Sequence, residues 1–329
     1  MATSSTAPPP PTPSYIFRGH TAAVNSVRFF DHNKYFVSGD ADGVIFVWKL
    51  RTRRPVLTWK AHEESCLSVN LIGNDKLLSQ GRDNSIHVWQ LPCLETDSKE
   101  IPKKLSTIVY DSLNFCKLCV CNIKDNDTLL CFPSLGDTSL VDIYSLQEQR
   151  WIIRGIGNAD AEDKKAATGI CMAVRILLLE DTVHIVSGYE DGSVVLWRIK
   201  ENNVQCIWRN KYHKEPVLDL AVDPLKSFIY STSADNQVIR HDVHSGKHHI
   251  VPTKKSGVAA VAIREDNKIL ATAGYDGKIR IFSIKSQKPL AVLSYHQDSV
   301  YALDFAELTK EHYMLSGGKD NRIALWSIY

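Results

Sequence analysis

The sequence predicts an all-β fold, a ring of seven blades with four short strands each, known as a β-propeller. Three observations predict this ring. A short polar and aromatic motif recurs along the chain, the segments that follow it are rich in β-branched and aromatic residues, and helical periodicity is absent throughout.

The recurring motif consists of a Ser or Thr, an Asp four residues later and a large ring side chain six residues further on. Six copies are plain. They are Ser38, Asp42 and Trp48; Ser79, Asp83 and Trp89; Ser187, Asp191 and Trp197; Ser231, Asp235 and His241; Thr272, Asp276 and Phe282; and Ser316, Asp320 and Trp326.

A seventh copy is predicted in the long interval between the second and third. Adjacent Asp residues of the motif lie 41 or 44 residues apart, but Asp83 and Asp191 lie 108 apart. Ser134, Thr138 and Tyr144 fit a degenerate copy in this interval. The period is that of WD40-repeat propellers, in which each repeat builds one blade.

Turn residues support the same organisation. In all six plain copies Asp is followed by Gly or Asn, the residues that accept a positive φ in a tight hairpin. We therefore expect these turns to join the second and third strands of each blade. The turn residues are Gly43, Asn84, Gly192, Asn236, Gly277 and Asn321.

A histidine precedes the motif in four units, and Lys254 takes its place in the sixth. Ser, His and Asp resemble a hydrolytic triad, but several similar copies cannot each be an active site. We therefore predict a structural hydrogen-bond network in each blade, made by the residues of the six plain copies together with the four histidines. These histidines are His20, His62, His213 and His296.

The ends of the chain predict how the ring closes. Residues 1–13 are small, polar and proline-rich, which predicts a disordered tail, and residues 14–329 are predicted to form a single propeller. Only three residues follow Trp326, so the last unit lacks its outermost strand. We expect Tyr15 to Arg18 to supply that strand and to remove an open sheet edge.

Composition excludes several classes of function. The 39 Lys and Arg residues nearly balance the 37 Asp and Glu residues, which argues against direct binding of nucleic acid. No secretory signal or membrane span is visible, so we expect an intracellular protein whose eight cysteines are reduced.

No catalytic, cofactor or metal site is predicted. The usual phosphate-binding and hydrolase fingerprints are missing. Cys116 and Cys119 have a spacing found in zinc sites, but the surrounding LNFCKLCVCNI is interpreted as one continuous strand with buried thiols.

We expect partner-binding residues in or beside the turns that carry the motif Asp. Arg and Tyr occur there, and both are typical interface anchors. Two insertions, residues 92–104 and 155–168, flank the degenerate unit, and the second should lie on the same face as these turns. The candidate partner-binding residues are Arg82, Tyr189, Glu190, Tyr275 and Lys319.

Five segments together resemble the family of ASTRA-associated protein 1 and its animal counterpart, G-protein-β-subunit-like protein 1. They are LSQGRD (78–83), GYEDGSVVLW (188–197), ATAGYDGKIRIF (271–282), KPLAVL (288–293) and KDNRIALWSIY (319–329). The resemblance implies a scaffold subunit of the ASTRA complex, connected with chromatin remodelling and with the co-chaperone machinery that matures phosphatidylinositol-3-kinase-related kinases. It also implies a nuclear and cytoplasmic protein, a monomeric propeller within a hetero-complex, without a membrane partner.

Three alternative functions stay open. A signalling G-protein β subunit would need a long N-terminal helix, which the proline-rich start does not supply. A ubiquitin-ligase substrate receptor often carries a WDxR motif, for which the nearest match is WKLR, Trp48 to Arg51. A propeller enzyme would need an asymmetric cluster of catalytic groups.

Overall fold

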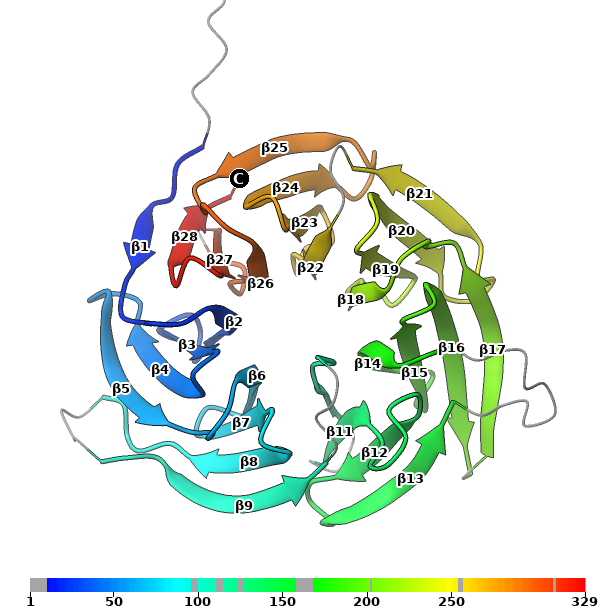
Figure 1. Ribbon diagram of the computed structural model, residues 1–329, viewed down its shortest axis with the longest axis horizontal. Coiled ribbons are helices and arrows are strands. Elements are labelled where there is room, and N and C mark those ends of the chain that lie inside the picture. The colour runs from blue at the N-terminus through cyan, green and yellow to red at the C-terminus, as the bar shows by residue number, and fades with distance from the viewer. Residues whose placement is uncertain are drawn as a thin grey trace, which may run out of the picture.

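The chain folds into a ring of seven blades (Figure 1). The structure, a computed structural model, describes residues 11–95, 100–110, 115–123, 127–157, 168–201, 203–253, 257–309 and 312–328. Within these ranges each blade is a four-stranded antiparallel sheet, which confirms the predicted seven-bladed propeller. The described residues contain no helix, and hence none that could cross a membrane.

Each of the first six blades consists of four consecutive strands. The first strand lies beside the central channel and the fourth lies at the rim (Figure 1). Blade 1 contains β2 (Val24–Phe30), β3 (Tyr35–Asp40), β4 (Val44–Lys49) and β5 (Arg54–Lys60). Blade 2 contains β6 (Cys66–Ile72), β7 (Lys76–Gly81), β8 (Ser85–Gln90) and β9 (Lys103–Val109). Blade 3 contains β10 (Cys119–Asn122), β11 (Thr128–Pro133), β12 (Val141–Ser145) and β13 (Arg150–Ile156). Blade 4 contains β14 (Cys171–Leu179), β15 (Thr182–Tyr189), β16 (Ser193–Lys200) and β17 (Asn203–Lys211). Blade 5 contains β18 (Val217–Val222), β19 (Phe228–Ser233), β20 (Gln237–Asp242) and β21 (His248–Pro252). Blade 6 contains β22 (Val258–Ile263), β23 (Ile269–Gly274), β24 (Lys278–Ser283) and β25 (Pro289–Ser294).

The seventh blade combines the two ends of the chain. Its strands are β26 (Val300–Phe305), β27 (Tyr313–Gly318), β28 (Ile323–Ser327) and, as the outermost strand, β1 (Tyr15–Phe17). The β1 strand pairs antiparallel with β28, and the register sets Phe17 opposite Ile323. The predicted closure by an N-terminal strand is therefore confirmed.

The hydrophobic core lies between neighbouring blades. At the closure, Phe17, Val24 and Trp48 pack with Leu315 and Leu325, so blades 1 and 7 share one apolar cluster. Alternating side chains of each pleated strand supply the apolar faces that make these contacts.

The predicted hydrogen-bond network is complete in blade 2. Trp89 Nε1–H donates to Ser79 Oγ at 2.8 Å, Ser79 Oγ lies 2.7 Å from His62 Nε2, and His62 Nδ1 lies 3.0 Å from Asp83. Burial lowers the pKa of His62, and a neutral ring fits the chain of donors and acceptors. The same arrangement occurs in blade 7 with Trp326, Ser316, His296 and Asp320.

Blade 5 contains the same network with a second histidine in the tryptophan position. His213 bridges Asp235 at 3.0 Å and Ser231 at 2.8 Å, and His241 Nε2 lies 2.9 Å from the Ser231 hydroxyl. Burial lowers the pKa of His241 to about 3. Because His213 Nδ1–H faces the Asp235 carboxylate, His213 Nε2 accepts the Ser231 hydroxyl hydrogen. The Ser231 oxygen then accepts the N–H of the neutral His241, as the serine oxygen accepts the indole N–H in the other blades.

Blade 1 differs from the prediction in its acidic residue. His20 and Trp48 both contact the Ser38 hydroxyl, at 2.7 and 2.8 Å. The carboxylate on His20 Nδ1, at 2.6 Å, belongs to Asp40. The predicted Asp42 is exposed and outside this network.

Blade 4 lacks the histidine, and a tyrosine replaces it. Trp197 donates to Ser187 at 2.8 Å, and the Ser187 hydroxyl also bonds to the buried Tyr189 hydroxyl at 3.1 Å. The predicted Asp191 instead bonds to Ser193 within its own turn.

The residue two positions after the Ser explains these differences. In blade 2 this residue is Gly81, where a Cβ would overlap the His62 ring, so the later Asp can reach the histidine. In blade 1 the same position is Asp40, which contacts His20 itself, and in blade 4 it is Tyr189. In blades 1 and 4 the side chain at this position therefore takes the place of the later Asp.

The network is missing from the described parts of blades 3 and 6. In blade 6, Asp276 pairs with Arg280 at 2.6 Å, Thr272 bonds to the Arg280 carbonyl, and Phe282 is buried without a polar atom to offer. Lys254, predicted in the histidine position, lies outside the described residues.

In blade 3 the predicted Tyr144 occupies the tryptophan position, because it pairs with Leu130 as Trp48 pairs with Phe36. The turn before it is two residues longer than in the other copies. Phe132, rather than the predicted Ser134, therefore takes the serine position.

Three local expectations need correction. Five of the six predicted turn residues have positive φ, but Asn236 does not. The segment interpreted as one continuous strand forms β10 only from Cys119, and residues 115–118 precede it as irregular chain. The predicted insertions overlap strands, since β9 begins at Lys103 and β13 extends to Ile156; residues 96–99 and 158–167 lie outside the described residues.

Removal of the closing strand should destabilise the whole ring. Deletion of residues 1–12 should leave the melting temperature unchanged, whereas deletion of residues 1–19 removes β1 and opens blade 7. Thermal unfolding followed by circular dichroism measures both. An unchanged transition in the longer deletion would show that the ring does not depend on this strand.

The buried His241 should make the protein sensitive to acid. Its folded-state pKa is about 3 and its ordinary value is 6.5, so below pH 6.5 the unfolded chain gains a proton that the folded chain excludes. On lowering the pH from 7 to 5, wild type should lose about 2 kcal/mol more stability than His241→Phe. Urea unfolding at both pH values measures this difference, and equal losses would contradict it.

Truncation of a network tryptophan should be costly. Trp197→Ala removes a buried ring and its hydrogen bond to Ser187, and should reduce the free energy of unfolding by about 3 to 5 kcal/mol. Arg198→Ala, a change at the next residue, which is exposed, is the control and should change it by less than about 0.5 kcal/mol. Urea titration of both variants checks the contrast.

Candidate interaction surface

The face that carries the Asp turns has a hollow at the mouth of the central channel. This hollow, here named the vestibule, has a volume of about 670 Å³. Its walls combine aromatic residues with cations. The lining residues used below are Arg82, Phe115, Lys117, Tyr275, Tyr301 and Lys319.

The structure brings three of the five predicted partner-binding residues together. Arg82, Tyr275 and Lys319 come from the turns of blades 2, 6 and 7 and line the vestibule. Glu190 is exposed beside the turn of blade 4 but does not line it. Tyr189 is only 1% exposed and belongs to the blade network, so its prediction as a contact residue is wrong.

One wall of the vestibule is a cation stacked on an aromatic ring. The Arg82 guanidinium lies 4.5 Å from the centre of the Phe115 ring, which is 60% exposed. The backbone N–H of Arg82 donates to the Ser65 carbonyl at 2.9 Å and fixes its turn to the preceding loop. Such a pair holds both side chains in a defined geometry.

The opposite wall is built around Tyr275, which is 44% exposed. Gly257, with φ of +81°, lies directly against the Tyr275 ring, and a Cβ at residue 257 would overlap that ring. Lys319 stands nearby, its ammonium 3.5 Å from the half-exposed Asp298 carboxylate. The position of the aromatic ring thus depends on a glycine of the preceding loop.

Lys117 forms the floor of the vestibule. Its ammonium donates to the Asn25 carbonyl at 2.8 Å and to the Tyr301 carbonyl at 2.9 Å. Because Asn25 is in blade 1 and Tyr301 in blade 7, this side chain crosses the channel from blade 3 to the closure. Burial lowers the pKa of Lys117 to about 8.

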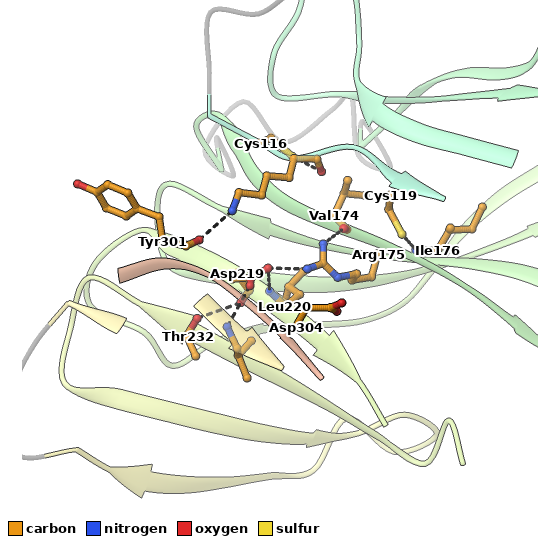
Figure 2. A network of polar contacts seen from close by, with 12 residues as sticks. Cys116, Cys119, Val174, Arg175, Ile176, Asp219, Leu220, Thr232, Tyr301 and Asp304 are labelled. Atoms are coloured by element: carbon orange, nitrogen blue, oxygen red, sulfur yellow. Dashed lines mark hydrogen bonds and ion pairs between the residues drawn. The ribbon is translucent and has the colours of Figure 1, made fainter. Parts of the chain in front are cut away.

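Below Lys117 lies a second chamber of the channel, with a volume of about 470 Å³. There, as Figure 2 shows, Arg175 donates to Asp219 at 2.6 Å. Asp219 also accepts the Val261 backbone N–H at 3.0 Å and so links blades 5 and 6. Arg28 and Asp304 make the equivalent pair between blades 1 and 7, at 2.8 Å.

These channel residues were not predicted from the sequence. Lys117, Asp219 and Asp304 are single charged residues inside otherwise apolar segments. That pattern was the available signal, since a charge within an inner strand must find a partner in the channel.

The polar clusters of the blades offer no reactive group. Ser79 is fully buried, and its oxygen already contacts both the Trp89 N–H and His62. His62, Asp83 and His87 bring three possible metal-ligand atoms within 4.8 Å. Both nitrogens of His62 are engaged in the blade network, and His87 Nδ1 lies 2.9 Å from the Thr107 hydroxyl. This cluster is therefore accounted for by the fold.

The thiols of blade 3 are also structural. Cys119 accepts the Ile176 backbone N–H at 3.3 Å, a contact between blades 3 and 4 (Figure 2). Burial raises the pKa of the Cys119 and Cys131 thiols, so both stay protonated and pack as small apolar groups.

Comparisons with known proteins agree with this architecture. A family model described as ASTRA-associated protein 1 matches residues 13–302, and a WD domain, G-beta repeat model matches residues 287–327. ASTRA-associated protein 1 of Aspergillus niger is 31% identical, with 91% of this chain and 82% of that protein aligned. The Schizosaccharomyces pombe protein of the same name is 30% identical, with 97% and 99% aligned.

A mouse relative shows the same correspondence outside fungi. Guanine nucleotide-binding protein subunit beta-like protein 1 of Mus musculus is 33% identical, with 98% of each chain aligned. The family model and these relatives cover the blades from the first to the last. The chain therefore belongs to the ASTRA-associated protein 1 family of WD40-repeat propellers.

Proposed function

We propose that this protein is a non-enzymatic scaffold subunit of an ASTRA complex. The observation that carries the proposal is the family match, which extends over almost the whole ring. A rigid closed ring with loops on two faces is suited to holding several proteins at once. The burial of the Ser and His side chains in the blade networks supports a role without catalysis.

The finer role follows from the family resemblance. We propose that the complex acts in chromatin remodelling and, with a co-chaperone, in the maturation of phosphatidylinositol-3-kinase-related kinases. Such work would place the protein in both the nucleus and the cytoplasm. Its partners would be other ASTRA subunits and kinase-maturation factors, with the propeller as one copy in a hetero-complex.

Affinity purification of the tagged chain, followed by mass spectrometry, tests the proposal. Recovery of ASTRA subunits and kinase-maturation factors is the expected result. Recovery of a cullin adaptor or of a G-protein γ subunit in their place would overturn it and favour a ubiquitin-ligase receptor or a signalling scaffold.

Variants of the vestibule should reduce this recovery. Arg82→Glu reverses a cation on one wall and Tyr275→Ala removes the aromatic ring of the other, so each should lower the yield of at least one partner by about tenfold. Lys285→Glu changes an exposed lysine in the β24–β25 turn on the opposite face and serves as the control.

Unchanged recovery of every partner in both vestibule variants would remove this face as the binding site. Melting temperatures of the three variants should match wild type. This control is needed because a loss of partners through unfolding would carry no information about the surface.

A further inference from the structure

We propose that the vestibule binds an extended acidic segment of a partner protein that carries an apolar anchor of large side chains. The inference rests on the proposed scaffold function and adds the chemistry of the ligand. Its support lies in the charge, the apolar walls and the preformed geometry of the lining residues.

The charged lining residues of the vestibule all have the same sign. Arg82, Lys117 and Lys319 are cations, and no carboxylate stands among the described lining residues. Asp298, which does not line the vestibule, forms an ion pair with Lys319. Both side chains are half-exposed, so this ion pair contributes little net stability. The lower chamber, in contrast, contains both signs. The vestibule therefore attracts negative charge.

The apolar part of the surface is large for an exposed site. Phe115, just before β10 of blade 3, and Tyr275, in the β23–β24 turn of blade 6, both line the vestibule and are 60% and 44% exposed. Tyr301, Met172 and Leu67 continue the wall between them. Exposed aromatic rings around a hollow favour an apolar anchor over a purely ionic ligand.

These groups are held in place before any ligand binds. Arg82 is stacked on Phe115, Gly257 admits the ring of Tyr275, and two carbonyl oxygens hold Lys117. Among the described residues the Lys117 ammonium uses two of its three N–H donors, which leaves one for a carboxylate. Preformed contacts of this kind lower the entropic cost of binding.

The volume of the hollow fits a short segment. About 670 Å³ lies within the range of sites that hold a small ligand or a few peptide residues. A single strand of nucleic acid would also use cations and aromatic rings. The near balance of charge over the whole chain favours the peptide, because tracking a phosphate backbone requires a wider basic surface.

Fluorescence anisotropy with labelled peptides on the full chain tests the inference. The probes are the acidic peptide EDELFDE, its charge-reversed form KRKLFKR, the form without an apolar anchor EDEGSDE, and a six-nucleotide uridine RNA. We expect EDELFDE to bind at least tenfold more tightly than the other three, with affinity that falls as salt is raised from 50 to 300 mM, ionic strengths at which screening increases.

Matched variants locate the binding. Lys319→Glu and Phe115→Ser should each weaken EDELFDE binding by at least fivefold, and Lys285→Glu, on the opposite face, should leave it unchanged. Melting curves identify any variant that fails to fold. Lys319→Glu changes only an exposed side chain, so it keeps the test valid if Phe115→Ser is unstable.

Three results would overturn the inference: equal binding of the charge-reversed peptide, tighter binding of the RNA, or equal weakening by the control variant. These results differ from failure of the proposed function. If the peptide fails but ASTRA subunits still co-purify, the ligand chemistry is wrong and the scaffold role stands. If the peptide binds but no ASTRA subunit co-purifies, the vestibule inference stands and the assembly is wrong.

Discussion

The ring depends above all on the contact between its first and last blades. The pairing of β1 with β28 joins segments from opposite ends of the sequence, and Phe17 is buried in the cluster that both blades share. Towards the channel, Asp304 binds both the Arg28 guanidinium and the Phe29 backbone N–H. Strand pairing, apolar packing and an ion pair that lines the channel therefore act at the same junction, and the remaining blades are held in a closed circle by it.

Repetition made the fold predictable. A buried tryptophan needs an acceptor for its N–H, and the serine on the neighbouring strand supplies it in four blades at 2.8 or 2.9 Å, so the two residues recur at fixed spacing. The acidic partner is less regular. Asp40 and Asp42 both flank the first turn. The spacing of the other copies favours Asp42, but Asp40, two positions after the serine, contacts His20 directly.

The vestibule was only partly predictable, for a different reason. Turns that carry the motif pointed to Arg82, Tyr275 and Lys319, since every copy places its turn on the same face. Phe115 and Lys117 belong to no repeat. Their role depends on where β10 begins. A run of apolar residues and cysteines does not indicate that residues 115–118 lie outside the strand.

Blade 3 connects these observations. Gln80 of blade 2 donates its side-chain amide to the Cys116 carbonyl at 3.0 Å and accepts the Leu118 N–H at 2.8 Å. This side chain fixes the irregular segment beside the channel, where a regular inner strand would otherwise run. Because the segment is held there, Phe115 reaches the mouth of the channel and Lys117 crosses it to blades 1 and 7. The irregular start of blade 3 and the placement of Phe115 and Lys117 in the vestibule thus have one structural cause.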